Sequence, residues 1–388
     1  MESTQSKSPP SPQPQGPLPV PVLFVITDMR VGGSQMVLAE TARSFDPARV
    51  KPVVACLKDP GALAPRLEQA GVPLYSNLIG GKRDVRVLWR LMRIIRRHKI
   101  RVVWTLDSGD KMFWGRLAAW LCRVKGIVSA LHMTRKADGT KVIERSNRLL
   151  EPITDCFVAV AEAAGEYLID HEGVPRDKLR VVYNGIDVSR FTGNGRAEAR
   201  KELGLAEDAP VAVHVAVFRP EKGHDVLLAA AQKVAERLPA ARFLLVGDGP
   251  TRSQVEAQCR EMGLAENVLF LGQRSDVPEL LAAADLSLLT SRGFVETFPM
   301  AILEAMASSR PSVCTNVGSI AEMIEDGRSG RLVESEDSDG LAAGILEIME
   351  NPATAEAWGR RAREIVTTQF SLQNMVAAHE KVIFSLNG

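Results

Sequence analysis

Residues 290–307 of this chain read TSRGFVETFPMAILEAMA, and an apolar run of strand length, Leu286 to Leu289, comes just before them. The part that starts at Pro299 is rich in Ala and Leu, which favours a helix with a proline in its first turn. A buried strand, a polar turn and a helix N-terminus in this order are typical of an α/β domain with a parallel sheet. The stretch therefore predicts such a sheet and the start of a helix at its carboxyl edge.

The start of this helix is a predicted anion site. The first backbone N–H groups of a helix have no partner inside the helix and carry the positive end of its dipole. We expect the N–H groups of Phe298, Met300 and Ala301, next to Pro299, to face a cleft above the strand ends. A phosphate group can bind to them there.

Two carboxylates flank the predicted anion site. Glu296 lies in the turn and Glu304 lies eight residues later on the helix, so both side chains can reach one bound molecule. A carboxylate accepts hydrogen bonds in pairs, which suits the neighbouring hydroxyls of a sugar or a ribose. The alternative that spacing alone leaves open is that Glu296 caps the helix and Glu304 lies on a solvated face.

The stretch resembles the Glu-x7-Glu motif of glycosyltransferase family four, whose members are retaining enzymes of the GT-B fold that use nucleotide-diphosphate sugars. The resemblance implies that Glu296 meets hydroxyls of the donor sugar and that Glu304 meets the nucleotide ribose. A second segment, VVYNGIDVSRF at residues 181–191, closely resembles the family's signature before its interdomain linker. By its residues alone this segment is a strand closed by an Asn-Gly turn, which indicates a domain boundary.

Length and composition indicate a two-domain globular protein. A chain of 388 residues with 45% hydrophobic and 24% charged residues suits two domains of ordinary size. No apolar run reaches the roughly 18 to 20 residues that a membrane span needs, and residues 1–18 lack the apolar centre of a signal peptide. We expect residues 1–18 to be a disordered tail, and we expect a cytoplasmic location, with any lipid contact at the inner face of a membrane.

The cysteines agree with a reducing compartment. Their number is odd, and they are scattered and mostly embedded in apolar runs, which predicts buried thiols rather than disulfides or a zinc cluster. The five residues are Cys56, Cys122, Cys156, Cys259 and Cys314.

Basic residues concentrate in the first half of the chain. Residues 1–190 carry 29 Lys and Arg against 19 Asp and Glu, whereas residues 191–388 carry 19 against 28. From Lys82 to Arg101 there are nine basic residues and one acid, and helical spacing places four arginines on one face: Arg86, Arg90, Arg93 and Arg97. We expect this face to meet an anionic phospholipid surface or a polyanionic acceptor, the alternative being a solvated helix. Nucleic acid is disfavoured because we expect no base-stacking aromatic on the exposed face.

The first half begins with a second strand, glycine turn and helix. Val20 to Thr27 is an apolar, β-branched run, and Gly32 and Gly33 lie in the turn that follows. Glycine lets backbone N–H groups approach a phosphate or sugar closely, so both are candidate donor-binding residues; a purely structural turn is the alternative. Further strand-like runs begin at residues 51, 72, 100, 126 and 155 and mostly alternate with helical patterns. This alternation predicts a mostly parallel sheet covered on both faces.

The second half repeats the plan, with strand-like runs at residues 210–218, 243–246, 268–271 and 312–315. We therefore expect an α/β protein of two Rossmann-like domains with an interdomain cleft. The resemblance implies an acceptor-binding domain at residues 19–188 and a nucleotide-sugar-binding domain at residues 189–368. It also implies a last helix, residues 369–388, that crosses back to the first domain.

Basic side chains near the predicted cleft are candidates for binding the diphosphate. Lys222 lies one turn before a helix, and the resemblance implies that it neutralises the departing diphosphate together with an arginine five residues earlier; this chain has Val217 there. Arg219 is the nearest replacement, provided that the strand stays extended to that point. The resemblance also implies that His132 lies beside the donor sugar and Arg274 beside the nucleotide base, the alternatives being a structural histidine and a solvated arginine.

The predicted function is transfer of a hexose or related sugar from a nucleotide-diphosphate donor to a hydroxyl of a glycan, lipid-linked or exopolysaccharide-precursor acceptor. The resemblance implies retention of configuration, with neither a metal nor a protein nucleophile. The segment 337–339 has the Asp-x-Asp form of a metal site, but it precedes a helical pattern and we interpret it as a helix cap.

Three alternative functions remain: a nucleotide-sugar epimerase of similar fold, a degenerate nucleotide-sugar-binding protein, which Val217 suggests, and a dinucleotide oxidoreductase. Against the oxidoreductase, neither half carries the full three-glycine turn.

Overall fold

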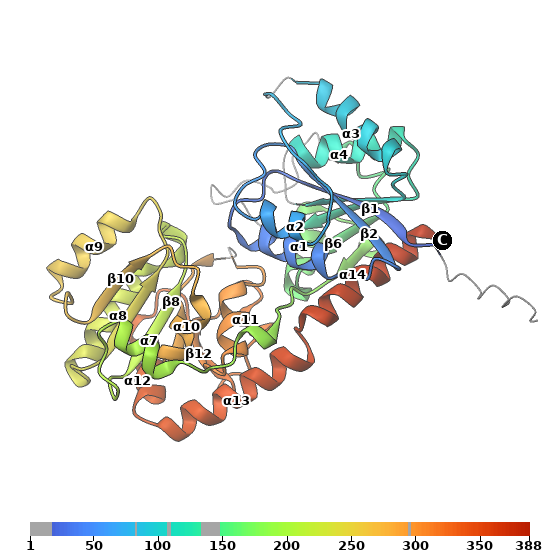
Figure 1. The fold of residues 1–388 in the computed structure, drawn as a ribbon. Helices are drawn as coiled ribbons and strands as arrows, with labels where there is room; N and C mark the ends of the chain where they lie inside the picture. Colours follow the sequence, from blue (N-terminus) through green and yellow to red (C-terminus); the bar gives the residue numbers. More distant parts are fainter. Residues whose placement is uncertain (1–17, 82–83, 107–109, 133–147, 294–295) are drawn as a thin grey trace, which may run out of the picture.

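The structure is a computed structural model that describes residues 18–81, 84–106, 110–132, 148–293 and 296–388. Two parallel sheets with flanking helices form its two domains (Figure 1). Of the predicted tail at residues 1–18, only the exposed Leu18 is described. Lys82 and Arg83, the first two residues of the basic segment, also lie outside the described residues.

The first sheet has the strand order β3-β2-β1-β4-β5-β6-β7. Its strands are β1 (Val20–Ile26), β2 (Val50–Cys56), β3 (Leu74–Tyr75), β4 (Val102–Leu106), β5 (Gly126–Leu131), β6 (Cys156–Ala159) and β7 (Leu179–Val181). Helices α3 (Arg86–Arg97) and α4 (Asp110–Leu121) share an apolar core with one face of this sheet. Helices α1 (Gly33–Ser44) and α2 (Ala64–Gln69) lie on the other face, and α6 (Glu162–Glu172) packs on β6 and β7. Burial on both faces explains why the strands are near-continuous apolar runs.

The second sheet has the strand order β10-β9-β8-β11-β12-β13. Its strands are β8 (Val211–Val215), β9 (Arg242–Val246), β10 (Val268–Gly272), β11 (Leu286–Leu289), β12 (Ser312–Thr315) and β13 (Gly330–Val333). Its helices are α7 (Arg196–Glu202), α8 (His224–Arg237), α9 (Arg252–Glu261), α10 (Val277–Ala283), α11 (Met300–Ala307) and α12 (Ser338–Met349). Asp337 accepts a hydrogen bond from the backbone N–H of Gly340 at 2.8 Å, so it caps α12 as predicted.

The last two helices connect the domains. Helix α13 (Pro352–Thr368) packs on α11 of the second domain, and α14 (Leu372–Asn387) packs on α1, β1, β4 and β5 of the first (Figure 1, red). Beside their junction runs the linker, since the N–H of Ile186 donates to the carbonyl of Phe370 at 3.0 Å and the N–H of Leu372 donates to the carbonyl of Ile186 at 2.9 Å. The predicted return of the C-terminal helix to the first domain is confirmed.

Helix α3 carries the basic segment, and two of its details differ from the prediction. Arg90 is not a free basic group, because its Nη1 atom donates to the carbonyl of Leu78 at 2.6 Å and to Asp84 at 2.8 Å. The expectation that the exposed face lacks an aromatic is wrong, because Trp89 is 66% exposed. Trp89 is three residues from Arg86 and four from Arg93, so helical spacing places it beside the arginines.

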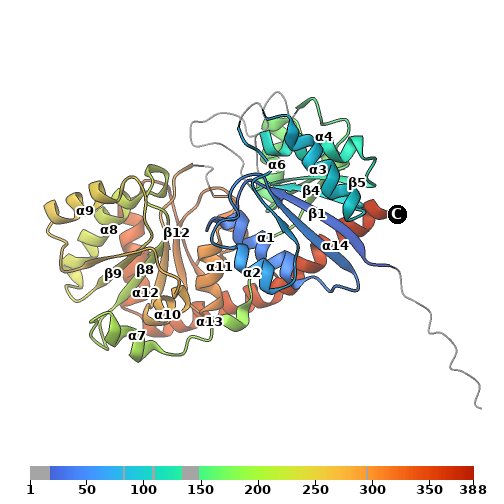
Figure 2. The same ribbon diagram turned by 45° about the horizontal axis from the view of Figure 1, so that its top comes forward.

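Both sheets reverse their strand order at one point, between β1 and β4 in the first and between β8 and β11 in the second. Open parallel sheets bind ligands at the carboxyl ends of the strands where this reversal occurs. Figures 1 and 2 both place α11, which follows β11, next to α1, which follows β1. The two reversal points therefore face the same region between the domains.

Candidate functional site

A cavity of about 490 Å³ lies between the two domains. The first domain contributes its glycine turn and part of α1 and α2, and the second contributes the turns after β8, β10 and β11 and the start of α11. Eight of the predicted site residues line it: Gly32, Gly33, Lys222, Arg274, Glu296, Pro299, Met300 and Glu304. The cavity thus exists only when both domains are present.

Two helices begin at this cavity without a side-chain cap. Helix α11 follows Pro299, which has extended backbone, and α1 follows Gly32. Among the described residues, no backbone carbonyl accepts a hydrogen bond from the N–H of Met300 or Ala301. Free N–H groups and the positive end of a helix dipole attract anions. The geometry is therefore that of the anion site predicted from the sequence.

Glu296 and Lys222 form an ion pair in the wall of the cavity. The Oε1 atom of Glu296 accepts hydrogen bonds from the ammonium of Lys222 and from the hydroxyl of Ser291, the latter at 2.5 Å. Glu296 is 6% exposed, and no donor among the described residues reaches its Oε2 atom. One carboxylate oxygen is thus held by the protein, and the other remains for a ligand.

Two glycines hold this pair in place. Gly223 has a φ of +63°, and a Cβ atom there would lie 2.0 Å from the carbonyl oxygen of Thr290. Gly318 has a φ of +59°, and a Cβ atom there would lie 1.7 Å from the carbonyl oxygen of Glu296. Glycine alone fits both the left-handed backbone and the close approach. The turns that carry Lys222 and Glu296 are therefore each packed against a neighbouring turn of the same sheet edge.

Glu304 is partly buried in the cavity wall. Loss of solvation raises the pKa of its carboxyl to about 7, and the positive charge of Arg190 opposes the rise. Arg190 and Arg66 also line the cavity, and sequence reasoning identified neither. Arg190 belongs to the segment 181–191, whose residues alone indicate only a domain boundary, and no motif marks Arg66 in α2. Only the fold brings the two arginines to the cavity.

The structure does not bring Arg219 to the cavity. Strand β8 ends at Val215, four residues before Arg219, so the strand does not continue to that point. The Arg219 side chain is 58% exposed and lies 3.8 Å from Glu221. It lines a different hollow of about 660 Å³ beside α8 and α9, whose lining comes from the second domain alone. Val217 does line the interdomain cavity, so no arginine occupies the position that the family pattern gives to one.

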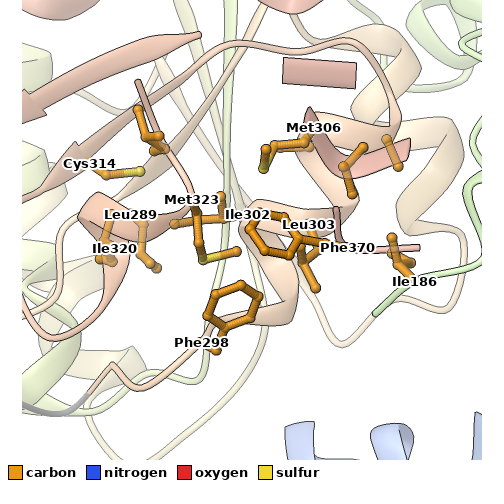
Figure 3. Close-up of a cluster of buried hydrophobic side chains, with 14 of the residues drawn as sticks. Ile186, Leu289, Phe298, Ile302, Leu303, Met306, Cys314, Ile320, Met323 and Phe370 are labelled. Carbon is orange, nitrogen blue, oxygen red and sulfur yellow. The ribbon is translucent and has the colours of Figure 1, made fainter. Parts of the chain in front are cut away.

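Phe298 and His132 lie next to the site, but neither lines the cavity. The Phe298 side chain is buried against Tyr183 and Phe370, in the apolar cluster of Figure 3. His132 follows β5, and its carbonyl accepts a hydrogen bond from the hydroxyl of Thr297 at 2.8 Å. The backbone of His132 therefore touches the turn after Glu296, and the contact of His132 with the donor stays a prediction.

Two family models match successive parts of the chain. The model described as Glycosyltransferase Family 4 matches residues 31–190, and the model described as Glycosyl transferases group 1 matches residues 195–365. Together they span most of the chain and meet at the linker between the two sheets. The chain belongs to glycosyltransferase family four.

Relatives and solved structures agree with this assignment. The N-acetyl-alpha-D-glucosaminyl L-malate synthase of Bacillus anthracis is 35% identical over 231 residues, which are 58% of this chain and 60% of that protein. The UDP-Gal:alpha-D-GlcNAc-diphosphoundecaprenol alpha-1,3-galactosyltransferase of Escherichia coli is 26% identical over 290 residues, which are 72% of this chain and 74% of that protein. The Anabaena protein HepE, solved in complex with UDP-glucose, superposes with a TM-score of 0.81 at 23% identity, over 94% of this chain and 99% of that one. The predicted GT-B fold is confirmed.

Proposed function

We propose that this protein is a retaining glycosyltransferase that transfers a hexose or related sugar from a nucleotide-diphosphate donor to an acceptor hydroxyl. The observation that carries the proposal is the single cavity that joins the glycine turn of the first domain to Lys222, Glu296, Glu304 and the start of α11. HepE, which shares the fold, was solved with UDP-glucose, which supports a nucleotide sugar as the ligand. No metal takes part in the reaction that we propose.

Each group has a distinct role in this proposal. The free N–H groups of Met300 and Ala301 and the ammonium of Lys222 bind the diphosphate, whose negative charge grows as it departs. The Oε2 atom of Glu296 accepts hydrogen bonds from hydroxyls of the sugar, and Glu304 accepts them from the ribose. The bond between the anomeric carbon and the diphosphate oxygen breaks with its electron pair on the diphosphate. The acceptor hydroxyl attacks from the same face, and its proton passes to a donor phosphate oxygen.

The test is the substitution Glu296→Gln, measured for turnover and for binding of free nucleoside diphosphate. We expect turnover to fall by roughly 100-fold, because a preorganised charged group that orients the sugar is lost. Nucleoside diphosphate binding should change by less than about threefold, since the helix start and Lys222 remain. Equal loss of turnover and binding would contradict the assigned role.

A protein that binds nucleotide sugars without turnover is the second candidate. Val217, which is 46% exposed and lines the cavity, favours it, because the leaving diphosphate then meets one ammonium group where the family pattern has a lysine and an arginine. Measuring both thermal stabilisation by nucleotide sugars and release of nucleoside diphosphate separates the two candidates. Stabilisation by a nucleotide sugar without release of nucleoside diphosphate, with every acceptor class offered, would support the binding protein.

The acceptor that we propose is a hydroxyl of a glycan or of a lipid-linked or exopolysaccharide precursor. The Escherichia coli relative is named for a diphosphoundecaprenol acceptor, which is a lipid-linked molecule. In the described residues no helix is both long enough and apolar enough to span a bilayer. A lipid-linked acceptor therefore implies contact with a membrane surface.

We place this contact on α3 and α4, which pack side by side on one face of the first sheet (Figures 1 and 2). Trp89 is 66% exposed on α3 and Trp120 is 52% exposed on α4. Arg93 and Arg97 are exposed as well, and neither forms an ion pair with any residue that the structure describes. Exposed tryptophans beside unpaired arginines are typical of a surface that lies on anionic lipid.

Co-sedimentation with vesicles tests this contact. We expect binding to vesicles that contain anionic phospholipid and not to neutral ones. The double variant Arg93→Ala/Arg97→Ala should weaken binding by roughly 30-fold, at about 1 kcal/mol per arginine. The double variant Lys201→Ala/Arg260→Ala removes the same charge from exposed positions of the second domain and serves as the control. Equal weakening in both variants, or no binding to anionic vesicles at any salt concentration, would refute the contact.

A further inference from the structure

Glu322 of the second domain makes three hydrogen bonds to residues 162–183, which precede the linker. It is the last residue of the short helix η5 (Ile320–Glu322). Its Oε1 atom accepts from the N–H of Ala163 at 2.8 Å. Its Oε2 atom accepts from the N–H of Glu162 at 2.9 Å and from the hydroxyl of Tyr183 at 2.9 Å. Both carboxylate oxygens are therefore bonded across the domain boundary.

The two N–H donors are the first two of helix α6, which lacks a cap of its own. The residue before α6 is Ala161, which has extended backbone and no side chain that can accept a hydrogen bond. Alanine is among the poorest N-cap residues, and a helix N-terminus favours a carboxylate because of its dipole. Glu322 thus supplies from the second domain the cap that the sequence of the first domain omits.

The segment that carries Glu322 also contacts the turn of Glu296. The N–H of Ser319 donates to the carbonyl of Glu296 at 3.3 Å, and Gly318 packs directly against the same carbonyl. If the segment that bears Glu322 were displaced, Gly318 and Ser319 would move with it, and the Glu296 turn would lose its contacts with them.

The turn of Glu296 makes two more contacts with the part of the chain before the linker. The hydroxyl of Thr297 donates to the carbonyl of His132 at 2.8 Å, and the side-chain amide of Asn184 donates to the carbonyl of Phe298 at 3.0 Å. Beneath these bonds lies the apolar cluster of Figure 3, which contains Phe298, Met323 and Phe370. Met323 follows Glu322 directly and is 1% exposed. The burial of Met323 therefore holds the backbone of Glu322 in place.

We propose that Glu322 is an interdomain cap: a positioning residue that binds the N-terminus of α6 and thereby sets the orientation of the two domains and the place of the Glu296 turn. It bonds to protein groups through both of its oxygens and does not line the cavity. Glu322 makes these bonds in the ligand-free protein, so its role as a cap does not depend on which molecule binds between the domains.

The substitution Glu322→Gln tests the interdomain cap, measured by amide hydrogen exchange and small-angle X-ray scattering on the ligand-free full chain. A glutamine keeps the size of the side chain but loses the charge and one acceptor. We expect the amides of Glu162 and Ala163 to exchange roughly tenfold faster, because a helix cap is lost, and the radius of gyration to increase. The central strands of both sheets should keep their protection.

Glu325→Gln is the matched control. Glu325 lies three residues away and pairs with Arg361 inside the second domain, with bonds of 2.6 and 2.8 Å. Loss of this pair should leave the exchange of the α6 amides and the scattering curve unchanged. Equal effects of Glu322→Gln and Glu325→Gln would overturn the proposal, because they would show general loosening of the segment.

Two further variants separate the orientation of the domains from the stability of α6. In Ala161→Ser/Glu322→Gln, the serine gives α6 a cap within its own domain. Restored amide protection with an enlarged radius of gyration would support the interdomain cap. Restoration of both would show that Glu322 only stabilises the helix and would overturn the proposal.

Tyr183→Phe removes one hydroxyl and keeps the ring against Phe298, and it should speed exchange of the α6 amides by about threefold. Unchanged exchange and scattering in both Glu322→Gln and Tyr183→Phe would also overturn the proposal. Because no readout uses turnover, failure of the proposed function would leave these results intact.

Discussion

Glu304 is the residue of the cavity whose charge depends most on its surroundings. Its carboxyl has an ordinary pKa of 4.5, and burial in the cavity wall raises this pKa to about 7. The charge of Arg190 acts in the opposite direction, but the loss of solvation is the larger effect. Near neutral pH a substantial fraction of the empty protein therefore carries a protonated Glu304, which can donate as well as accept a hydrogen bond.

The first prediction concerns the pH dependence of stability. Because the folded pKa of about 7 lies above the ordinary 4.5, protonation of Glu304 favours the folded state. This contribution is fully present below about pH 4.5 and is lost as the pH rises through about 7. Urea denaturation at pH 5 and pH 8 measures the free energy of unfolding. Between these pH values the wild type should lose about 2.5 kcal/mol more of it than Glu304→Gln does. Identical pH slopes in the two proteins would show that Glu304 titrates normally.

At the scale of elements, the turns that follow the strands position the chemistry. The turn of Glu296 and the turn at Gly318 follow the neighbouring strands β11 and β12, so both lie at the same edge of the sheet. Their contact is close enough that Gly318 has no room for a side chain, and its backbone is left-handed. The position of Glu296 therefore depends on a glycine that no ligand is expected to touch.

The second prediction is that Gly318→Ala lowers the free energy of unfolding more than a comparable glycine substitution does. Gly327→Ala is the control, because Gly327 has a φ of +68° and the nearest atom to its Cβ position is the flexible end of Arg331 at 3.7 Å. Both variants should lose about 1 to 2 kcal/mol of stability from the left-handed backbone. Gly318→Ala should lose about 2 kcal/mol more, because its Cβ meets the carbonyl of Glu296. Chemical denaturation measures both, and equal losses would refute the predicted packing.

At the scale of the whole molecule, the C-terminal helix is part of the first domain although its sequence follows the second. Ile383 on α14 is fully buried in the core that also contains Phe24 of β1 and Trp104 of β4. His379, one turn earlier, lies against Trp104 with 4.9 Å between ring centroids. The first sheet therefore needs the last residues of the chain to complete one of its faces.

The third prediction is that loss of packing on α14 destabilises the first domain selectively. Ile383→Ala should cost about 3 kcal/mol, as expected for a large side chain removed from a core. Hydrogen exchange should rise in β1, β4 and β5 while β8 and β11 keep their protection. The control Ile345→Ala changes a fully buried residue of α12 in the second domain and should give the reverse pattern. The same pattern for both variants would mean that the two domains unfold as one unit.

Much of the fold could be predicted because its strands are buried on both faces. The apolar runs at residues 126–131, 286–289 and 312–315 coincide with β5, β11 and β12. The sequence pattern does not predict strand β13, because its four residues include Arg331 and a local pattern does not reveal the ion pair of Arg331 with Glu347. Of the predicted site residues, Glu296, Glu304 and Lys222 line the cavity. Arg219 was offered on the condition that the strand stays extended to that point, and β8 ends at Val215, so Arg219 lies outside the cavity.

By itself, the sequence determined the alternation of strands and helices, the two domains' shared plan and the family. These follow from local periodicity and from motifs in which the functional residues are close in the chain. Only the tertiary structure decided that Arg66 and Arg190 meet at the cavity and that Glu322 caps a helix of the other domain. The physical reason is that such contacts join residues far apart in sequence, and they form only when long-range packing brings two separately patterned segments together.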